Sequence, residues 1–364
     1  MQRDFAPPQH IITRFRTRRL LDLAPVLTIA VNPYHLTLRE LPAMASLLLA
    51  DKAVTALPTP PGGDTREDVQ RAMVNCPRYT RLLESWRWAS PLWRCGAVTS
   101  LHQGDDAMAD VRGAMTTMAS DPACKPLHPF LHKDMLTRPD ELLDHLCADL
   151  LKGGPDPGFC VPVAGAMDRF AARHGLLVTR SGRDAASGKS VSAASGGTAS
   201  LVQRAEEMLG RTVFTLALPV LASASGRTLE DLRADLEPEL SPLRQAISET
   251  ASAAAENSTA ATVQAQQRRI REAGAVYAQA FEDVIGGMLD RDDDRGIRVT
   301  AATCRIVCRV LPADAVVRSS VAALRTARRV GLLNRDEPDA AVATENPEAS
   351  RAVVTLVVSA MPRE

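Results

Sequence analysis

The sequence predicts a helix-dominated mixed α/β fold, with a small and mostly buried sheet, many helices and one long antiparallel helical hairpin. Short β-branched segments of strand length alternate along the chain with segments of helical periodicity, a pattern typical of α/β proteins. Much of the apolar content is Ala and only 4% of the residues are aromatic, which favours closely packed helices. The 364 residues exceed the usual size of one compact domain, so we expect two regions.

The expected strands are apolar runs rich in Val, Ile and Leu, at residues 26–31, 176–179, 212–221, 297–310 and 353–358. The expected helices place apolar side chains three and four residues apart, at residues 36–49, 79–93, 105–118, 137–150, 163–174, 201–209 and 313–330. The segment GGPDPG at residues 153–158 interrupts both patterns. It marks the expected boundary between a mainly helical region with one early strand, residues 1–155, and an α/β region, residues 156–364.

The strongest periodic signal runs over residues 228–289 and predicts the helical hairpin. Leucines recur at intervals of three and four in its first half, and an apolar residue recurs every seven positions from Val263 through Ile270 in its second half. A polar tip at residues 256–261 separates the halves, so the two apolar stripes can pack against each other. Pro238 and Pro242 are expected to kink or interrupt the first helix.

Charge and composition exclude several classes of protein. Lys plus Arg equals Asp plus Glu at 43 each, so no net charge attracts nucleic acid or an anionic membrane. No apolar run approaches the ~20 residues that a membrane span needs. Seven cysteines without a repeated spacing favour a reducing compartment over a disulfide framework. We therefore expect a soluble cytoplasmic protein, and the excess of Arg over Lys and of Ala indicates a bacterial-like, GC-rich coding sequence.

Thiol and imidazole side chains gather at Cys124, His128 and His132. Zinc prefers these ligands, and a zinc ion held here could lower the pKa of a bound water for hydrolysis. Pro126 and Pro129 prevent one continuous helix, so the three side chains need not share a face. A zinc-assisted hydrolase and ordinary loop residues are the two alternatives at this cluster, and no other cofactor is predicted.

Lys189 and Ser190 follow a glycine and a predicted strand, as the residues of a phosphate-binding loop do. The spacing departs from the Walker pattern, because five residues instead of four separate Gly182 from Gly188. The surrounding residues 181–200 are almost entirely Ser, Gly and Ala, which predicts a flexible loop. The alternatives here are a phosphate or nucleotide site and a plain linker.

Apolar residues on helices are the third kind of candidate. On one helix Trp86 and Trp93 share a face while Trp88 points elsewhere, so Trp88 is the tryptophan expected at a contact surface. In the hairpin, Val263 and Ile270 are expected to present a face to a second copy or to another protein. The sequence carries no motif for acyl transfer, metalloproteolysis or dinucleotide binding. We therefore expect a non-catalytic interaction or structural protein, with the hydrolase and the nucleotide binder as alternatives.

Overall fold

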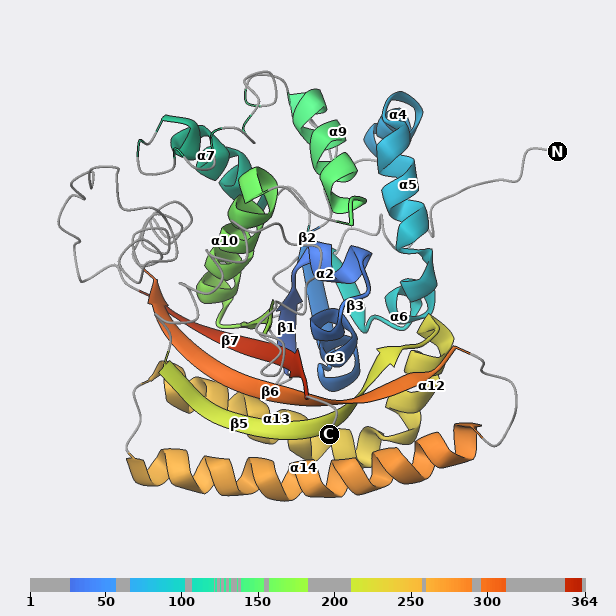
Figure 1. Ribbon diagram of the computed structural model, residues 1–364, viewed down its shortest axis with the longest axis vertical. Coiled ribbons are helices and arrows are strands. Elements are labelled where there is room, and N and C mark those ends of the chain that lie inside the picture. The colour runs from blue at the N-terminus through green and yellow to red at the C-terminus, as the bar shows by residue number, and fades with distance from the viewer. Residues whose placement is uncertain are drawn as a thin grey trace.

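The computed structural model describes residues 27–56, 66–101, 107–120, 139–153, 157–182, 211–256, 260–289, 296–311 and 351–361, together with residues 122, 125, 128, 131 and 136. These residues form a mixed α/β fold in which helices cover both faces of one sheet (Figure 1). The fold class that the sequence predicts is confirmed. Within the described ranges the sheet has seven strands, in the order β3-β2-β1-β4-β7-β6-β5.

The first five strands in this order are parallel, and β6 runs antiparallel to both β7 and β5. The strands are β1 (Thr28–Val31), β2 (Lys52–Ala56), β3 (Val98–Leu101), β4 (Leu177–Ser181), β5 (Arg211–Ser223), β6 (Arg298–Leu311) and β7 (Arg351–Ala360). The sequence did not predict β2 and β3, because each is very short and rich in Ala, Thr or Ser. The region before residue 155 therefore contributes three strands, and β1 pairs with β4 across the expected boundary.

The helices are α2 (Pro33–Thr37), α3 (Leu41–Leu49), α4 (Arg66–Asn75), α5 (Pro77–Ser85), the 3-10 helix η2 (Arg87–Ala89), α6 (Ser90–Arg94), α7 (Ala107–Ser120), α9 (Pro139–Leu150), α10 (Pro157–His174), α12 (Gly226–Asp235), α13 (Glu237–Ala255) and α14 (Ala260–Leu289). The expected helix at 36–49 is two helices, since the chain turns at Arg39, whose φ is 50°. The expected helices at 201–209 and 313–330 lie outside the described residues.

The predicted hairpin consists of α13 and α14, which lie side by side along the sheet, with α12 before them (Figure 1). The interruption of its first helix falls at Leu236, between α12 and α13. Pro238 lies in the first turn of α13, where a proline removes no helical hydrogen bond. Pro242 lies inside α13 without ending it.

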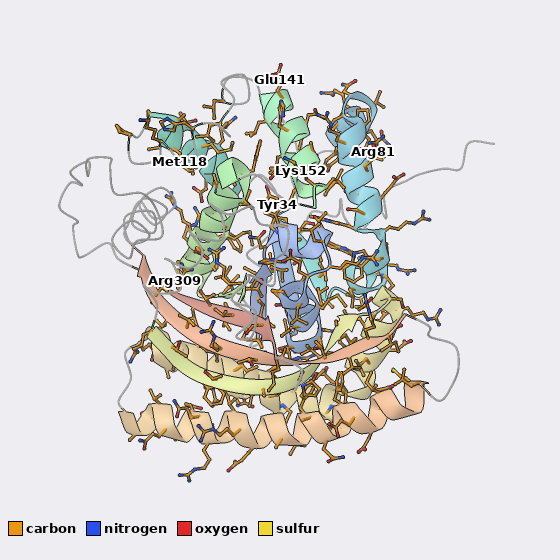
Figure 2. All side chains as sticks on the ribbon, in the orientation of Figure 1. Tyr34, Arg81, Met118, Glu141, Lys152 and Arg309 are labelled. Carbon is orange, nitrogen blue, oxygen red and sulfur yellow. The ribbon has the colours of Figure 1, made fainter. Side chains whose placement is uncertain are left out.

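Successive residues of a strand point to opposite faces of the sheet, so neighbours on β6 identify what covers each face. Cys308 Sγ lies 3.6 Å from the carbonyl oxygen of Ala254 in α13, on the face that α3 and α12–α14 cover. Arg309 points the other way and donates to Asp168 of α10 at 2.7 Å (Figure 2). α10, with α7 packed on it, therefore covers the second face.

α3 occupies the centre of the first face, where it contacts β1, β4, β5 and β7. Its sequence, LPAMASLLL, is apolar on all sides, and all nine residues are buried. The last carbonyl groups of an α-helix have no partner within the helix. Because this helix end is buried, those carbonyls need donors from elsewhere in the protein.

Arg233 of α12 supplies most of these donors. Its Nη1 donates to the carbonyl oxygens of Leu47 and, at 2.6 Å, Ala50, and its Nη2 donates to that of Asp51 at 3.0 Å. Burial lowers the pKa of Arg233 to about 10, which still leaves the guanidinium charged at neutral pH. A positive charge at this end also interacts favourably with the helix dipole.

Arg244 of α13 completes the cap. Its Nε donates to the carbonyl oxygen of Leu49 at 2.9 Å. Its Nη1 lies 3.0 Å from a carboxylate oxygen of Asp51 and 2.7 Å from one of Glu237, so the buried guanidinium is neutralised by two acidic side chains. The end of α3 is thus held by two arginines from later in the chain.

We expect Arg233→Met to lower the free energy of unfolding by about 3 kcal/mol, because buried carbonyls left without donors each cost roughly 1–3 kcal/mol. Arg227 is exposed on the same helix, and Arg227→Met is the matched control, expected to change stability by less than about 0.5 kcal/mol. Chemical denaturation followed by circular dichroism measures both. Equal effects of the two substitutions would contradict the role of Arg233.

Gly226, the first residue of α12, is closely packed against η2. A Cβ atom at this position would lie 2.0 Å from the carbonyl oxygen of Trp88. We expect Gly226→Ala to destabilise the protein by roughly 1–3 kcal/mol through this overlap. A Cβ at Gly286 in α14 meets nothing within 4 Å, so Gly286→Ala should stabilise by about 0.5–1 kcal/mol through helix propensity. Thermal unfolding of the two variants should therefore shift in opposite directions.

Candidate functional site

The order of the strands reverses between β1 and β4. From β1 the chain moves outward to β2 and β3, and it then returns on the other side of β1 as β4. Ligands of open α/β sheets bind beyond the carboxyl ends of the strands at such a reversal. We call this part of the protein the switch edge, and define it by Asn32, Tyr34, Thr55, Ser100 and Ser181, which lie at or just beyond the carboxyl ends of β1 to β4.

α2 begins directly after β1 at this edge. The side-chain oxygen of Asn32 accepts a hydrogen bond from the backbone N–H of Tyr34 at 3.0 Å, and Pro33 has no N–H. The start of this helix therefore offers little to a phosphate group, which needs free backbone donors. Asn32 is buried, and its amide nitrogen makes no hydrogen bond to any residue that the structure describes. That nitrogen remains a donor for another molecule.

Thr55 and Ser100 lie side by side on β2 and β3 and are paired in register. Both point to the same face as Val31, the face that α3 covers, because aligned residues of neighbouring strands share a side. Thr55 is 1% exposed, and the hydroxyl oxygens of Thr55 and Ser100 are buried with no hydrogen-bond partner in the part of the chain that the structure describes. A buried hydroxyl without a partner costs roughly 1–3 kcal/mol. The fold therefore places two hydroxyl groups next to each other whose burial lowers the stability of the protein.

α9 is held over the switch edge by one strong contact. The phenol oxygen of Tyr34 donates to a carboxylate oxygen of Asp149 at 2.6 Å, and both side chains are buried. Figure 2 shows Tyr34 where α2 faces α9. Short hydrogen bonds to an ionised carboxylate are about twice as strong as neutral ones. This bond therefore fixes the position of α9 relative to the end of β1.

His35 follows Tyr34 in α2 and is the histidine closest in sequence to the switch edge. Its Nδ1 lies 2.6 Å from a carboxylate oxygen of Glu40, and both side chains are largely buried. This contact orients the imidazole ring, and Nε2 is the ring nitrogen that it does not use.

The structure describes only one of the three zinc candidates. His128 Nε2 lies 2.8 Å from the carbonyl oxygen of Met118, to which it can donate. Cys124 and His132 lie outside the described residues. Among the described residues no group of three His, Cys, Asp or Glu side chains could hold a metal ion. The zinc-assisted hydrolase therefore stays a prediction.

The other predicted site residues fall in three different settings. Lys189 and Ser190 lie outside the described residues. Trp88 is half-buried, with the guanidinium of Arg39 4.9 Å from its ring centre. Val263 is also half-buried, whereas Ile270 is fully buried. Ile270 is thus a core residue that cannot itself contact a partner, because its stripe of α14 packs onto the sheet.

The residues of the switch edge were absent from the sequence-based candidates for a physical reason. Thr55 and Ser100 carry no motif, and the short strands that place them together were not predicted. Asn32 does carry a signal, since Asn followed by Pro after an apolar strand is typical of a helix start. That signal predicts where β1 ends, but it does not predict which strands lie beside β1.

The chain matches no family model, no curated protein and no solved structure. The fold and the switch edge therefore define only a structural class. This class is a doubly wound α/β sheet, extended here by β6 and β5, which pair antiparallel to each other. Where the structure describes the chain, none of its helices has the length and apolar character to cross a bilayer.

We expect Thr55→Val to raise the free energy of unfolding of the ligand-free protein by about 1 kcal/mol, because a methyl group replaces a buried hydroxyl that has no partner. Thr37→Val is the matched control. The Thr37 hydroxyl donates to the carbonyl oxygen of Pro33 and accepts from the indole Nε1 of Trp86, both at 2.8 Å, so its loss should destabilise by roughly 1–3 kcal/mol. Denaturant titrations that show both variants destabilised would contradict the assignment of Thr55.

Proposed function

We propose that the protein binds a small, uncharged polar molecule of the nucleoside or sugar class at the switch edge. The observation that carries this proposal is the pair of buried hydroxyls on Thr55 and Ser100, for which the described residues supply no hydrogen-bond partner. Each hydroxyl can donate one hydrogen bond and accept two. A ligand with hydroxyl or amide groups would supply the missing partners and remove the cost of burying them.

The charges around the switch edge favour an uncharged ligand over a phosphorylated one. In the first turn of α2, Pro33 has no backbone N–H and that of Tyr34 is bound by Asn32. Arg180, at the carboxyl end of β4, points to the opposite face and lies 2.6 Å from Asp168, which also binds Arg309. These two guanidinium groups are thus engaged away from the face of Thr55. Among the described residues a phosphate would find few donors on the face of Thr55, whereas sugar hydroxyls need only neutral partners.

Asn32 and His35 would add further hydrogen-bonding groups near the carboxyl end of β1. The amide nitrogen of Asn32 can donate to a carbonyl or a ring nitrogen, and His35 Nε2 can accept from a hydroxyl. Together with the two strand hydroxyls, these groups would offer donors and acceptors to a ligand that runs along the carboxyl ends of β1 to β3. The proposal concerns binding alone. Any proton transfer by His35 would take place only in the complex with a ligand.

Thermal unfolding in the presence of common nucleosides, their 5′-monophosphates and simple sugars tests the proposal. We expect at least one nucleoside or sugar to raise the melting temperature by several degrees, since a ligand at 100 times its Kd stabilises by about 2.7 kcal/mol. The monophosphate of a binding nucleoside should bind no more tightly than the nucleoside. Thr55→Val should reduce the shift although it stabilises the free protein.

Thr215 provides the matched control, because it is an exposed threonine on β5, distant in the strand order from the switch edge. Thr215→Val should leave every ligand-induced shift unchanged. If no compound in the panel shifts the melting temperature, the proposed ligand class is wrong. If the phosphorylated compounds bind best, a charged ligand replaces the uncharged one.

A further inference from the structure

β5 forms one edge of the sheet. β6 pairs with one side of this strand, and no described strand lies on its other side, which we call the outer edge. β5 has 13 residues, whereas a typical strand has about five or six. An edge strand presents a row of backbone N–H and C=O groups to any other extended chain. A long outer edge is therefore a place where the protein could pair with another strand.

The pairing of the strands identifies the backbone groups that point to the outer edge. The backbone N–H of Met361 donates to the carbonyl oxygen of Ala301 in β6 at 2.9 Å, so the backbone groups of Ala301 are directed to β7. Ala301 lies opposite Pro219 of β5, and opposite residues of an antiparallel pair direct their backbone groups either toward each other or apart. The carbonyl of Pro219 therefore points to the outer edge. The backbone groups of Thr215 and Ala217, at alternate positions before it, point the same way.

α14 runs along β5 and contributes hydrogen-bond donors to it (Figure 1). The side-chain amide of Gln267 donates to the carbonyl oxygen of Val213 at 2.9 Å, where a register shift interrupts the pairing of β5 with β6. The hydroxyl of Tyr277 donates to the carbonyl oxygen of Pro219 at 3.0 Å. Ten residues of a helix span ~15 Å and six residues of a strand span ~20 Å, so both contacts can form where the helix lies along the strand.

Between these two contacts α14 comes very close to β5. Gly274 is buried, and a Cβ atom at this position would lie 3.0 Å from the side chain of Leu216. The guanidinium of Arg271 lies 5.8 Å from the ring centre of Phe214, within the range of an attractive cation–π contact. The residues of α14 that make the four contacts are three or four positions apart, so they lie on one side of the helix. That side of α14 is thus matched to β5 along its length.

We propose that α14 is a strap that closes the outer edge of β5 and prevents the protein from pairing through this edge with a second copy of itself. Two carbonyl groups of β5 have donors from α14, and Pro219 has no N–H to offer to another strand. Without the strap, β5 of one copy could pair antiparallel with β5 of a second copy about a two-fold axis. A second copy fits this edge because it presents the same backbone groups in the matching order.

The oligomeric state of the double variant Gln267→Ala/Tyr277→Phe tests the proposal. Size-exclusion chromatography with light scattering should show the unsubstituted protein as a monomer. The folded double variant should contain a dimer whose fraction rises with protein concentration and is severalfold larger than in the unsubstituted protein. Gln264 is exposed on the same helix, so Gln264→Ala is the matched control and should stay monomeric.

Two further variants separate pairing through the edge from a loss of stability. Gly226→Ala destabilises the contact of α12 with η2 and leaves α14 unchanged, so it should stay monomeric under the same conditions. Ala217 is exposed, and a lysine at this position would place a charge on the outer edge, which opposes strand pairing. Ala217→Lys, added to the double variant, should therefore restore the monomer. Circular dichroism establishes that each variant is folded before the comparison.

Amide hydrogen exchange resolved to single residues identifies the surface through which the double variant pairs. In the monomer, the N–H groups of Thr215 and Ala217 should exchange faster than those of Leu216 and Leu218, which lie opposite β6 residues and point to them. In the dimer of the double variant, exchange at Thr215 and Ala217 should slow by about tenfold or more, because strand pairing protects these groups.

Four outcomes would overturn the proposal. They are an unsubstituted protein that already pairs through β5, a folded double variant that stays monomeric, equal association of Gly226→Ala, and a dimer that persists after Ala217→Lys. If the double variant does not fold, Gln267→Ala alone decides the matter, since it removes one half-buried contact. That single variant should still form more dimer than Gln264→Ala, and equal dimer fractions would contradict the role of α14.

Discussion

All nine residues of α3 are buried, so the carbonyl groups at its end depend on donors from other parts of the chain. Arg233 and Arg244 meet this requirement, and they do so from α12 and α13, which follow α3 by a long stretch of sequence. Asp51 extends the contact, since its carboxylate binds Arg244 and also accepts the backbone N–H of Leu27 at 2.9 Å. The first βαβ unit and the helical layer are thereby held in one arrangement.

The end of α3 and the switch edge both contain buried polar groups, but the described residues supply hydrogen-bond partners in different ways at the two places. At the end of α3, buried carbonyls receive donors from charged side chains, although burying an arginine is costly. At the ends of β2 and β3, the hydroxyls of Thr55 and Ser100 receive no hydrogen bond from the described residues. Other buried polar atoms also lack a described partner, among them Arg244 Nη2, so the significance of Thr55 and Ser100 lies in their place beside each other at the carboxyl ends of β2 and β3.

The sequence predicted the elements that are long enough to show a period. α14 and α10 were found for this reason. The single helix expected at residues 79–93 was wrong, because this segment is α5, η2 and α6. Trp86 and Trp93 are nevertheless both buried, and their rings stack at 6.5 Å between centres. β2 and β3 are as short as the predicted β1 and β4 but lack a run of large apolar residues, so the strand order and the switch edge could not be predicted. The contact of Cys76 with Asp144 depends on the packing of α5 on α9, which no local pattern records.

β7 lies inside the sheet, between β4 and β6, although it is the last described strand along the chain. Until it is synthesised, β4 and β6 each expose an unpaired edge, and such edges can pair with other chains. The sheet can therefore close only after translation has passed residue 360, and closure joins segments that are far apart in sequence, which slows folding. During this interval the exposed strand edges favour association with other chains.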